Sequence, residues 1–204
     1  MSIASNRIEE DLWLQQARQG DRAAFSRIVQ AYQKPVYNLC YRTLGDADEA
    51  EDATQETFLR AYTNFSRYDP DRRFLTWILS IASNHCIDRL RRRRQVWLSL
   101  DDEPVMEQIA APAESPQHSA ERREQSETVQ RWLSQLAPDY RVPLVLLYWY
   151  ELSYEEIAAT MDLSVAAVKS RLHRGRKQIA DLMLAETRSP YVPIPTASPA
   201  ILAS

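Results

Sequence analysis

The stretch Leu152–Leu184, LSYEEIAATMDLSVAAVKSRLHRGRKQIADLML, has the pattern of a helix-turn-helix. Ser153 followed three residues later by Glu156 forms a capping box, which predicts the start of a short helix. Asp162 stands at the turn, where a left-handed backbone is needed and Asp is tolerated. Ser164 can cap a second helix. The stretch therefore predicts two consecutive helices arranged as a DNA-binding unit.

The second helix of this unit combines an apolar stripe with a basic remainder. Val165, Val168 and Leu172 recur at helical spacing and are predicted to pack on the first helix. Polar residues in the N-terminal half of such a helix reach base edges, and later basic residues neutralise phosphates. The candidate DNA contacts are Lys169, Ser170, Arg171, His173, Arg174, Arg176 and Lys177. A solvated basic face is the alternative, but this spacing with both caps favours DNA binding.

Composition predicts that the rest of the chain is helical too. The 204 residues include only three glycines and no long alternating runs, so the class is all-α. The net charge is -3, but acidic and basic residues are concentrated in separate segments of the chain. Asp46–Glu56 holds six acids and no base, whereas Asp88–Arg94 holds five arginines and Lys169–Lys177 five Lys and Arg residues. Acidic and basic faces of one protein can each have their own partner.

The cysteines and the apolar runs indicate a cytoplasmic protein. Cys40 and Cys86 lie in apolar, helix-patterned runs and are expected to be buried, reduced thiols. No signal-peptide core is visible near the N-terminus, and no apolar run approaches the roughly 20 residues of a membrane span, so no membrane insertion is expected. His85, His118 and His173 are scattered, so neither a metal site nor a cofactor is expected.

Helical periodicity predicts three helices in the N-terminal part. The first begins after a cap at Asp21 and ends at Gly45, with a kink or a fresh start at Pro35. The next two are expected over residues 46–65 and 74–93, joined by a loop at about 66–73.

Periodicity also divides the chain. Residues 1–94 are predicted as one small helical domain and 121–186 as a second. Residues 95–120, with three prolines among acids, alanines and serines, indicate a flexible linker, and the proline-rich tail 187–204 is expected to be disordered. Within the second domain, Pro138 opens a helix that ends near Tyr150, and Pro143 predicts a kink or a later start.

Three motifs occur in this order: DADEAEDATQETFLRAY at 46–62, FLTWI at 74–78 running to IDRLRR at 87–92, and LSYEEIA at 152–158 running to KSRL at 169–172. Together they resemble the extracytoplasmic-function (ECF) group of bacterial sigma-70 factors. The resemblance covers about 21–94 and 121–184. It implies a sigma factor that binds core RNA polymerase, directs it to promoters through the −35 and −10 elements, and helps to melt the −10 region.

The resemblance also implies roles for individual residues. Asp52, Gln55, Glu56 and Arg60 would grip the clamp helices of the largest polymerase subunit. Asn84 and Asp88 would read −10 bases, with a flipped base held between them and the loop Ser66–Arg73, while Arg89, Arg91 and Arg92 would hold phosphates. The helix-turn-helix would read the −35 element, the flap of the second-largest subunit would be a further contact, and an anti-sigma factor is an expected partner.

Two competing interpretations are weaker. A stand-alone helix-turn-helix regulator would need a dimerisation or sensing domain, which residues 21–94 do not resemble. An enzyme is not expected, because His85 and Cys86 are adjacent on a helix and point about 100° apart. One departure from the family pattern is Glu151, which stands where glycine is frequent.

Overall fold

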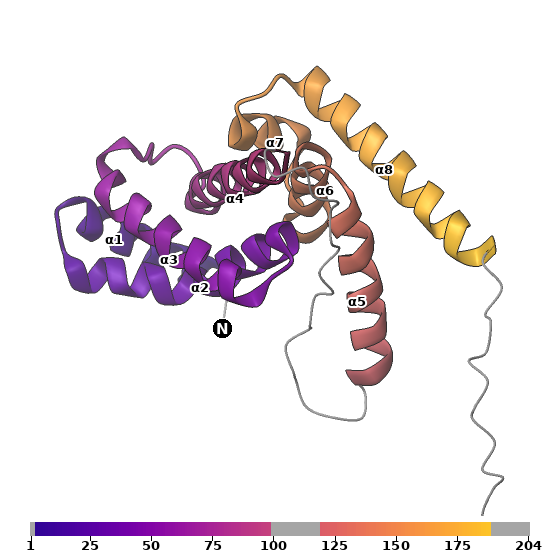
Figure 1. Cartoon of the computed structure of the whole chain (residues 1–204). Helices are drawn as coiled ribbons and strands as arrows, with labels where there is room; N and C mark the ends of the chain where they lie inside the picture. Colours follow the sequence, from indigo (N-terminus) through magenta and orange to yellow (C-terminus); the bar gives the residue numbers. More distant parts are fainter. Residues whose placement is uncertain (1–2, 99–118, 189–204) are drawn as a thin grey trace, which may run out of the picture.

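The computed structural model describes residues 3–98 and 119–188, and side chains over 9–93 and 127–186. Every regular element in these ranges is helical, which confirms the all-α class (Figure 1). The elements are α1 Ile3–Arg18, α2 Arg22–Leu44, α3 Ala47–Thr63, the 3-10 turn η1 Phe65–Arg67, α4 Phe74–Leu98, α5 Ser119–Gln135, α6 Pro138–Tyr150, α7 Tyr154–Met161 and α8 Val165–Arg188. The predicted linker and tail lie outside the described residues, at 99–118 and 189–204.

The N-terminal helices match the predicted caps but differ in extent. Asp21 caps α2 by accepting from the backbone of Ala23 and Ala24, and Gly45 ends it with φ 83°. Pro35 lies inside one continuous helix, so the fresh start considered there does not occur. Helix α1 was not expected from the sequence, and α4 runs to Leu98, beyond the expected end near residue 93.

The second domain is built on close helix contacts that depend on particular backbone positions. Glu151 ends α6 with φ 52°, a left-handed conformation that glycine adopts at less cost. Helix α6 begins at Pro138, as predicted, and Pro143 lies within it. A Cβ atom on Gly175 would lie 2.8 Å from Cδ1 of Leu144, so glycine allows α8 to approach α6 closely.

The two domains are docked against each other. Helix α2 contacts α5 and α6, and α4 contacts α6 and α7, so the C-terminal helices cover one side of the N-terminal bundle (Figure 1). Buried apolar residues from both domains belong to one continuous core cluster. No local pattern predicts this contact, because it joins residues that are 48 to 115 positions apart in the chain.

The chemistry of the core agrees with the expectations for the thiols. Cys40 and Cys86 are free and fully buried. Their mutual hydrogen bond and burial raise the pKa of the Cys86 thiol. Among the helices that the structure describes, none is long and apolar enough to cross a bilayer.

Candidate nucleic-acid and polymerase surfaces

The helix-turn-helix has the predicted local geometry. Ser153 Oγ accepts from the amide of Glu156 over 3.1 Å, and the Glu156 carboxylate accepts from the Ser153 amide over 2.9 Å, which completes the capping box. Asp162 takes the left-handed turn with φ 53°. Ser164 Oγ accepts from the amide of Ala167 over 3.2 Å and caps α8. The turn is therefore fixed by hydrogen bonds on both of its sides.

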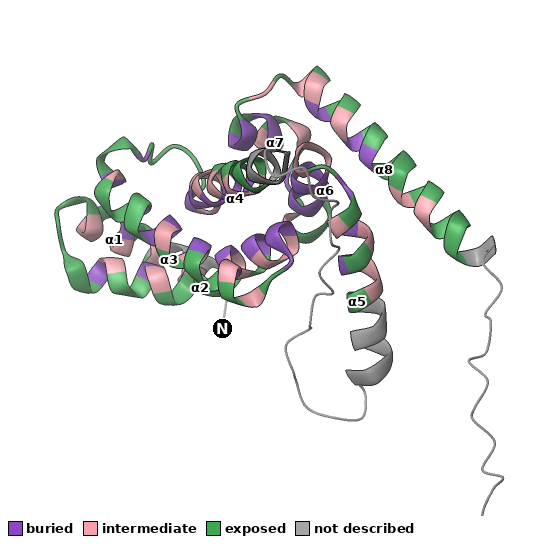
Figure 2. Ribbon diagram, in the orientation of Figure 1, coloured by how far each residue is buried: buried purple, intermediate pink, exposed green. Residues whose placement is uncertain are grey.

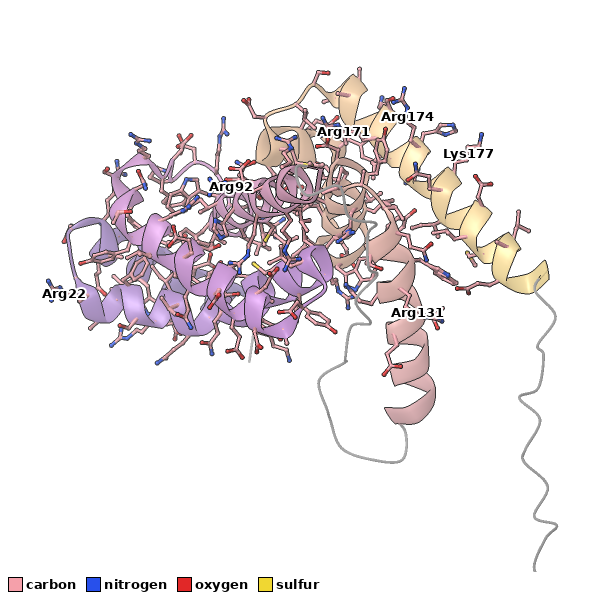
Figure 3. All side chains as sticks on the ribbon, in the orientation of Figure 1. Arg22, Arg92, Arg131, Arg171, Arg174 and Lys177 are labelled. Carbon is pink, nitrogen blue, oxygen red and sulfur yellow. The ribbon has the colours of Figure 1, made fainter. Side chains whose placement is uncertain are left out.

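Helix α8 packs its predicted stripe on the core and exposes most of its basic residues. Val168 and Leu172 are fully buried, and Val165 is half-buried. Exposed residues run along the rest of the helix (Figure 2), and Arg174 and Lys177 point outward from it (Figure 3). The exposed candidates for −35 contacts are Lys169, Ser170, His173, Arg174, Arg176 and Lys177.

Three arginines of α8 donate to α6 side chains, and Arg174 is one of them, with its Nη1 3.4 Å from the hydroxyl of Tyr140. Arg176 Nε donates to the hydroxyl of Tyr148 over 3.0 Å and its guanidinium lies 5.7 Å from that ring; hydrogen bonds with Tyr154 and Tyr148 raise the pKa of Arg176. Arg171 is half-buried, and its Nη1 donates to Oδ1 of Asp139 over 3.3 Å. Successive helical residues are about 100° apart, so Arg171 lies at the edge of the exposed basic face, about 60° from Arg174, and in this structure it is directed to Asp139.

Helix α4 presents the predicted −10 face to solvent. Asn84 and Asp88 are both exposed and lie one turn apart. Arg91 and Arg92 continue this face and are also exposed. Arg91 Nη2 lies 3.2 Å from Oδ1 of Asp139, whereas Arg92 makes no ion pair with any described residue. An amide, a carboxylate and a free guanidinium on one helix face can hydrogen-bond base edges and hold phosphate.

Arg89 differs from the other candidates on α4. Its Nη2 lies 3.6 Å from both Glu49 and Asp52 of α3, and only 32% of its side chain is exposed. Arg93 also pairs with Glu49. These arginines therefore join α4 to the acidic helix, which the sequence alone did not reveal.

The loop before α4 is anchored by aromatic packing. Tyr68 is buried, and its hydroxyl donates to the carbonyl of Arg72 over 2.7 Å. Burial raises the pKa of Tyr68 to about 12. Trp77 packs edge-on against Phe65, with ring centroids 5.8 Å apart. These contacts anchor the loop 66–73 to the aromatic core, while Asp69 within the loop is exposed.

The acidic helix α3 exposes the predicted polymerase stripe. Asp52 has 67% of its side chain exposed, Arg60 45% and Glu56 36%. Arg60 Nε donates to Oε1 of Glu56 over 2.6 Å, and this hydrogen bond lowers the pKa of the Glu56 carboxyl. Gln55 is exposed on the same side. Burial and the nearby Arg60 guanidinium lower the pKa of His85, which lies on α4.

Leu59 is a candidate that sequence reasoning missed. It is 58% exposed and lies within the arc spanned by Asp52, Gln55, Glu56 and Arg60. An exposed leucine surrounded by charged residues resembles the apolar centre and polar rim of a protein interface. Leu59 follows Gln55 by one helical turn, so its place on the same stripe could have been recognised from the sequence.

Comparisons with known proteins match both halves of the chain. Residues 28–96 match Sigma-70 region 2, and residues 126–179 match Sigma-70, region 4. The ECF RNA polymerase sigma factor SigW of Bacillus subtilis is 40% identical over 180 residues, which cover 83% of this chain and 96% of that protein. The RNA polymerase sigma-H factor of Pseudomonas aeruginosa is 35% identical over 178 residues, covering 84% and 92%.

Solved structures share the fold. CnrH in complex with the cytosolic domain of CnrY aligns with a TM-score of 0.61 and 25% identity, covering 87% of this chain and 99% of that chain. The sigma factor RpoE in complex with the anti-sigma factor NepR from Bartonella quintana aligns with a TM-score of 0.65 and 20% identity, covering 79% and 98%. At 20% identity, the similarity to RpoE shows a shared fold only.

Proposed function

The chain belongs to the ECF group of the sigma-70 family and is a sigma factor for transcription initiation, and we propose which of its surfaces contact core polymerase and promoter DNA. Residues 1–94 bind core polymerase and the −10 element, and residues 121–186 bind the −35 element. The observation that supports this division is the pair of exposed polar faces, Asn84 and Asp88 on α4 and the basic side of α8, one in each matched region.

The proposed polymerase contact is the α3 stripe of Asp52, Gln55, Glu56 and Arg60, extended by Leu59. We propose that it meets the clamp helices of the largest subunit, while the second domain also contacts the flap of the second-largest subunit. The exposed charged residues supply orientation, and Leu59 supplies apolar area that becomes buried on binding.

The proposed DNA contacts fall into two classes. Asn84 and Asp88 read a −10 base held against the loop 66–73, and Arg89, Arg91 and Arg92 hold the neighbouring backbone. On α8, Lys169, Ser170, Arg171, His173, Arg174, Arg176 and Lys177 are the proposed −35 set. Phosphate contacts position a protein on DNA, while base contacts give it sequence preference.

Further proposals concern partners and setting. The similar structures are complexes with the cytosolic domain of CnrY and with the anti-sigma factor NepR, which supports an anti-sigma factor as a partner here. We propose that the chain acts in the cytoplasm and catalyses no reaction itself. A stand-alone helix-turn-helix regulator is not favoured, because residues 28–96 match sigma-70 region 2.

In vitro transcription with purified core polymerase on a randomised promoter library tests the proposal. We expect initiation only when the chain and the core are both present, from promoters that share a −35 and a −10 sequence. A gel-shift assay without core provides the comparison. Tight, sequence-specific duplex binding by the free chain would contradict a polymerase-dependent factor.

A further inference from the structure

Helix α8 approaches α6 closely at Gly175. A Cβ atom on this residue would lie 2.8 Å from Cδ1 of Leu144 and 3.3 Å from the carbonyl oxygen of Tyr140, so a larger residue would push the two helices apart. Tyr140, Leu144 and Tyr148 recur at intervals of four residues and therefore share one face of α6. The close approach thus places one tyrosine a turn before the contact with Gly175 and another a turn after it.

Both tyrosines accept hydrogen bonds from the arginines that flank Gly175. Arg174 Nη1 donates to the hydroxyl of Tyr140 over 3.4 Å, and Arg176 Nε donates to the hydroxyl of Tyr148 over 3.0 Å. Residues two positions apart on a helix are separated by about 200°, so these arginines extend to opposite sides of α8. Helix α6 therefore holds one arginine on each side of the helix proposed to enter the major groove.

Arg176 is held beside the first helix of the helix-turn-helix as well. Its guanidinium also hydrogen-bonds the side chain of Tyr154, which begins α7. In a helix-turn-helix bound to DNA, the first helix crosses the sugar-phosphate backbone while the second lies in the groove. A residue of α8 that is anchored next to the start of α7 is therefore close to the path of the phosphates.

The anchorage of Arg176 leaves its charge uncompensated. The Tyr148 hydroxyl is neutral, and none of the ion pairs between described residues includes Arg176. The Tyr148 ring lies 5.7 Å from the guanidinium, within the range of a cation–π contact. A guanidinium has five N–H donors and the bond to Tyr148 uses the one on Nε, so donors remain for a phosphate oxygen.

The other two arginines that α6 holds differ from Arg176 in this respect. Arg171 Nη1 lies 3.3 Å from the Asp139 carboxylate, which opposes its positive charge. Arg174 bonds to Tyr140 through its terminal Nη1 atom, so a DNA contact at that atom would replace the bond. Of the three, Arg176 is the one that a neutral group fixes through Nε, behind the atoms that reach DNA.

We propose that Tyr148 is a positioning residue of the −35 contact, which holds Arg176 ready for a phosphate oxygen of the DNA backbone. This inference rests on the proposed function, in which Arg176 is a −35 contact. A flexible arginine loses side-chain freedom on binding, and that loss weakens the complex. Because Tyr148 restricts Arg176 before DNA arrives, part of the loss has already occurred in the unbound helix.

The test measures promoter DNA binding by the holoenzyme formed with core polymerase. Tyr148→Phe removes the hydroxyl and keeps the ring, and Tm should not change because Tyr148 is 58% exposed. We expect affinity to fall about threefold, within the range for ordering one flexible side chain. Tyr140→Phe is the matched control on the same face of α6, and it should cause no loss of affinity because DNA replaces its bond to Arg174.

A double-mutant cycle with Arg176→Ala separates positioning from a direct contact between Tyr148 and DNA. In the Arg176→Ala chain, Tyr148→Phe should have no further effect, because the hydroxyl acts through the guanidinium. The salt dependence of binding is a second measurement. Arg176→Ala should lower the log–log slope by about 0.9, the value for one phosphate, whereas Tyr148→Phe should leave the slope unchanged because the charge still reaches DNA.

The outcomes separate this inference from the proposed function. If Tyr148→Phe binds like wild type while Arg176→Ala binds more weakly, the positioning role is overturned and the −35 contact stands. A threefold loss that persists in the Arg176→Ala chain would also overturn it, since Tyr148 would then act on DNA or on the fold directly. An Arg176→Ala chain that matches wild type in affinity and slope would remove Arg176 from the proposed −35 set and overturn the inference as well.

Discussion

Arg89 Nη2 lies 3.6 Å from Oδ2 of Asp52, so a candidate promoter contact on α4 is joined to a candidate polymerase contact on α3. The pair is partly exposed, with 32% of the Arg89 side chain and 67% of the Asp52 side chain accessible. Exposed ion pairs contribute little to stability, so we expect this one to orient Arg89 toward α3 more than to hold the helices together.

Arg89 and Arg92 should therefore differ in their effect on DNA binding. Arg92 is exposed and makes no ion pair with a described residue, whereas Arg89 already has two acidic partners. Arg92→Ala should lower the salt dependence of holoenzyme binding to promoter DNA by about 0.7–0.9 in log–log slope, the value for one phosphate. Arg89→Ala should change this slope less. Equal losses in a salt titration would contradict the structural assignment.

Leu59 should contribute to polymerase binding without supporting the fold. Because it is 58% exposed, Leu59→Ala leaves little buried packing to lose. If it anchors the interface, affinity for core polymerase should fall about tenfold, equivalent to ~1.4 kcal/mol. Leu12→Ala, at a 49% exposed leucine of α1, is the matched control. Binding is measured by fluorescence anisotropy with labelled chain, and equal affinities of the two variants would remove Leu59 from the contact.

Asn84→Ala should change −10 preference more than polymerase affinity. The side chain is exposed on α4 one turn before Asp88, where its amide can both donate to and accept from a base. Loss of a base contact is expected to relax discrimination at one promoter position by about 1–3 kcal/mol. Transcription from a randomised −10 library measures it. Leu59→Ala provides the reciprocal control, and an unaltered Asn84→Ala profile would exclude this base contact.

Arg174→Ala should weaken −35 recognition. Arg174 is exposed on the outer side of α8, and its Nη1 donates to the hydroxyl of Tyr140 over 3.4 Å, a long hydrogen bond that a contact with DNA would replace. A lost arginine contact to guanine corresponds to about 1–3 kcal/mol. Footprints and transcription by the holoenzyme on −35 variants measure the loss. Arg22→Ala, at an exposed arginine of α2, controls for charge, and identical behaviour of the two variants would eliminate the contact.

The stability contributed by Glu156 should depend on pH. Hydrogen bonds from Ser153 lower the pKa of the Glu156 carboxyl, with a smaller effect of Arg73. Its stabilisation is therefore present above the unfolded pKa of about 4.3 and is lost as the pH falls through the lower folded value. Glu156→Gln should lower Tm at pH 7 by about 2–4 °C, for a capping contribution of ~1 kcal/mol.

This difference should shrink toward zero near pH 3, because the wild-type carboxyl is then protonated and resembles the amide. Thermal melts followed by circular dichroism over pH 3–7 measure it. Glu155→Gln, one residue earlier and exposed, should show no such trend. A gap between wild type and Glu156→Gln that stays constant with pH would argue against the carboxylate as the stabilising group.

Local signals in the sequence determined several of the helix ends. The capping box of Ser153 and Glu156, the turn at Asp162 and the caps at Asp21 and Gly45 all appear as predicted. Each depends on hydrogen bonds or backbone conformations within a few residues, so neighbouring sequence is sufficient. The order of motifs likewise identified the family, while the roles of the individual site residues stay predictions.

Only the tertiary structure decided which residues from distant parts of the chain contact one another. Pro35 remains inside α2 because Ile28 before it and Val36 after it are both fully buried, so packing on other helices outweighs the lost hydrogen bond. Arg171, at the edge of the exposed basic face, is directed to Asp139. The partner of a charged side chain is whichever group the fold brings within a few ångströms, and that depends on docking of domains whose joining residues are far apart in sequence.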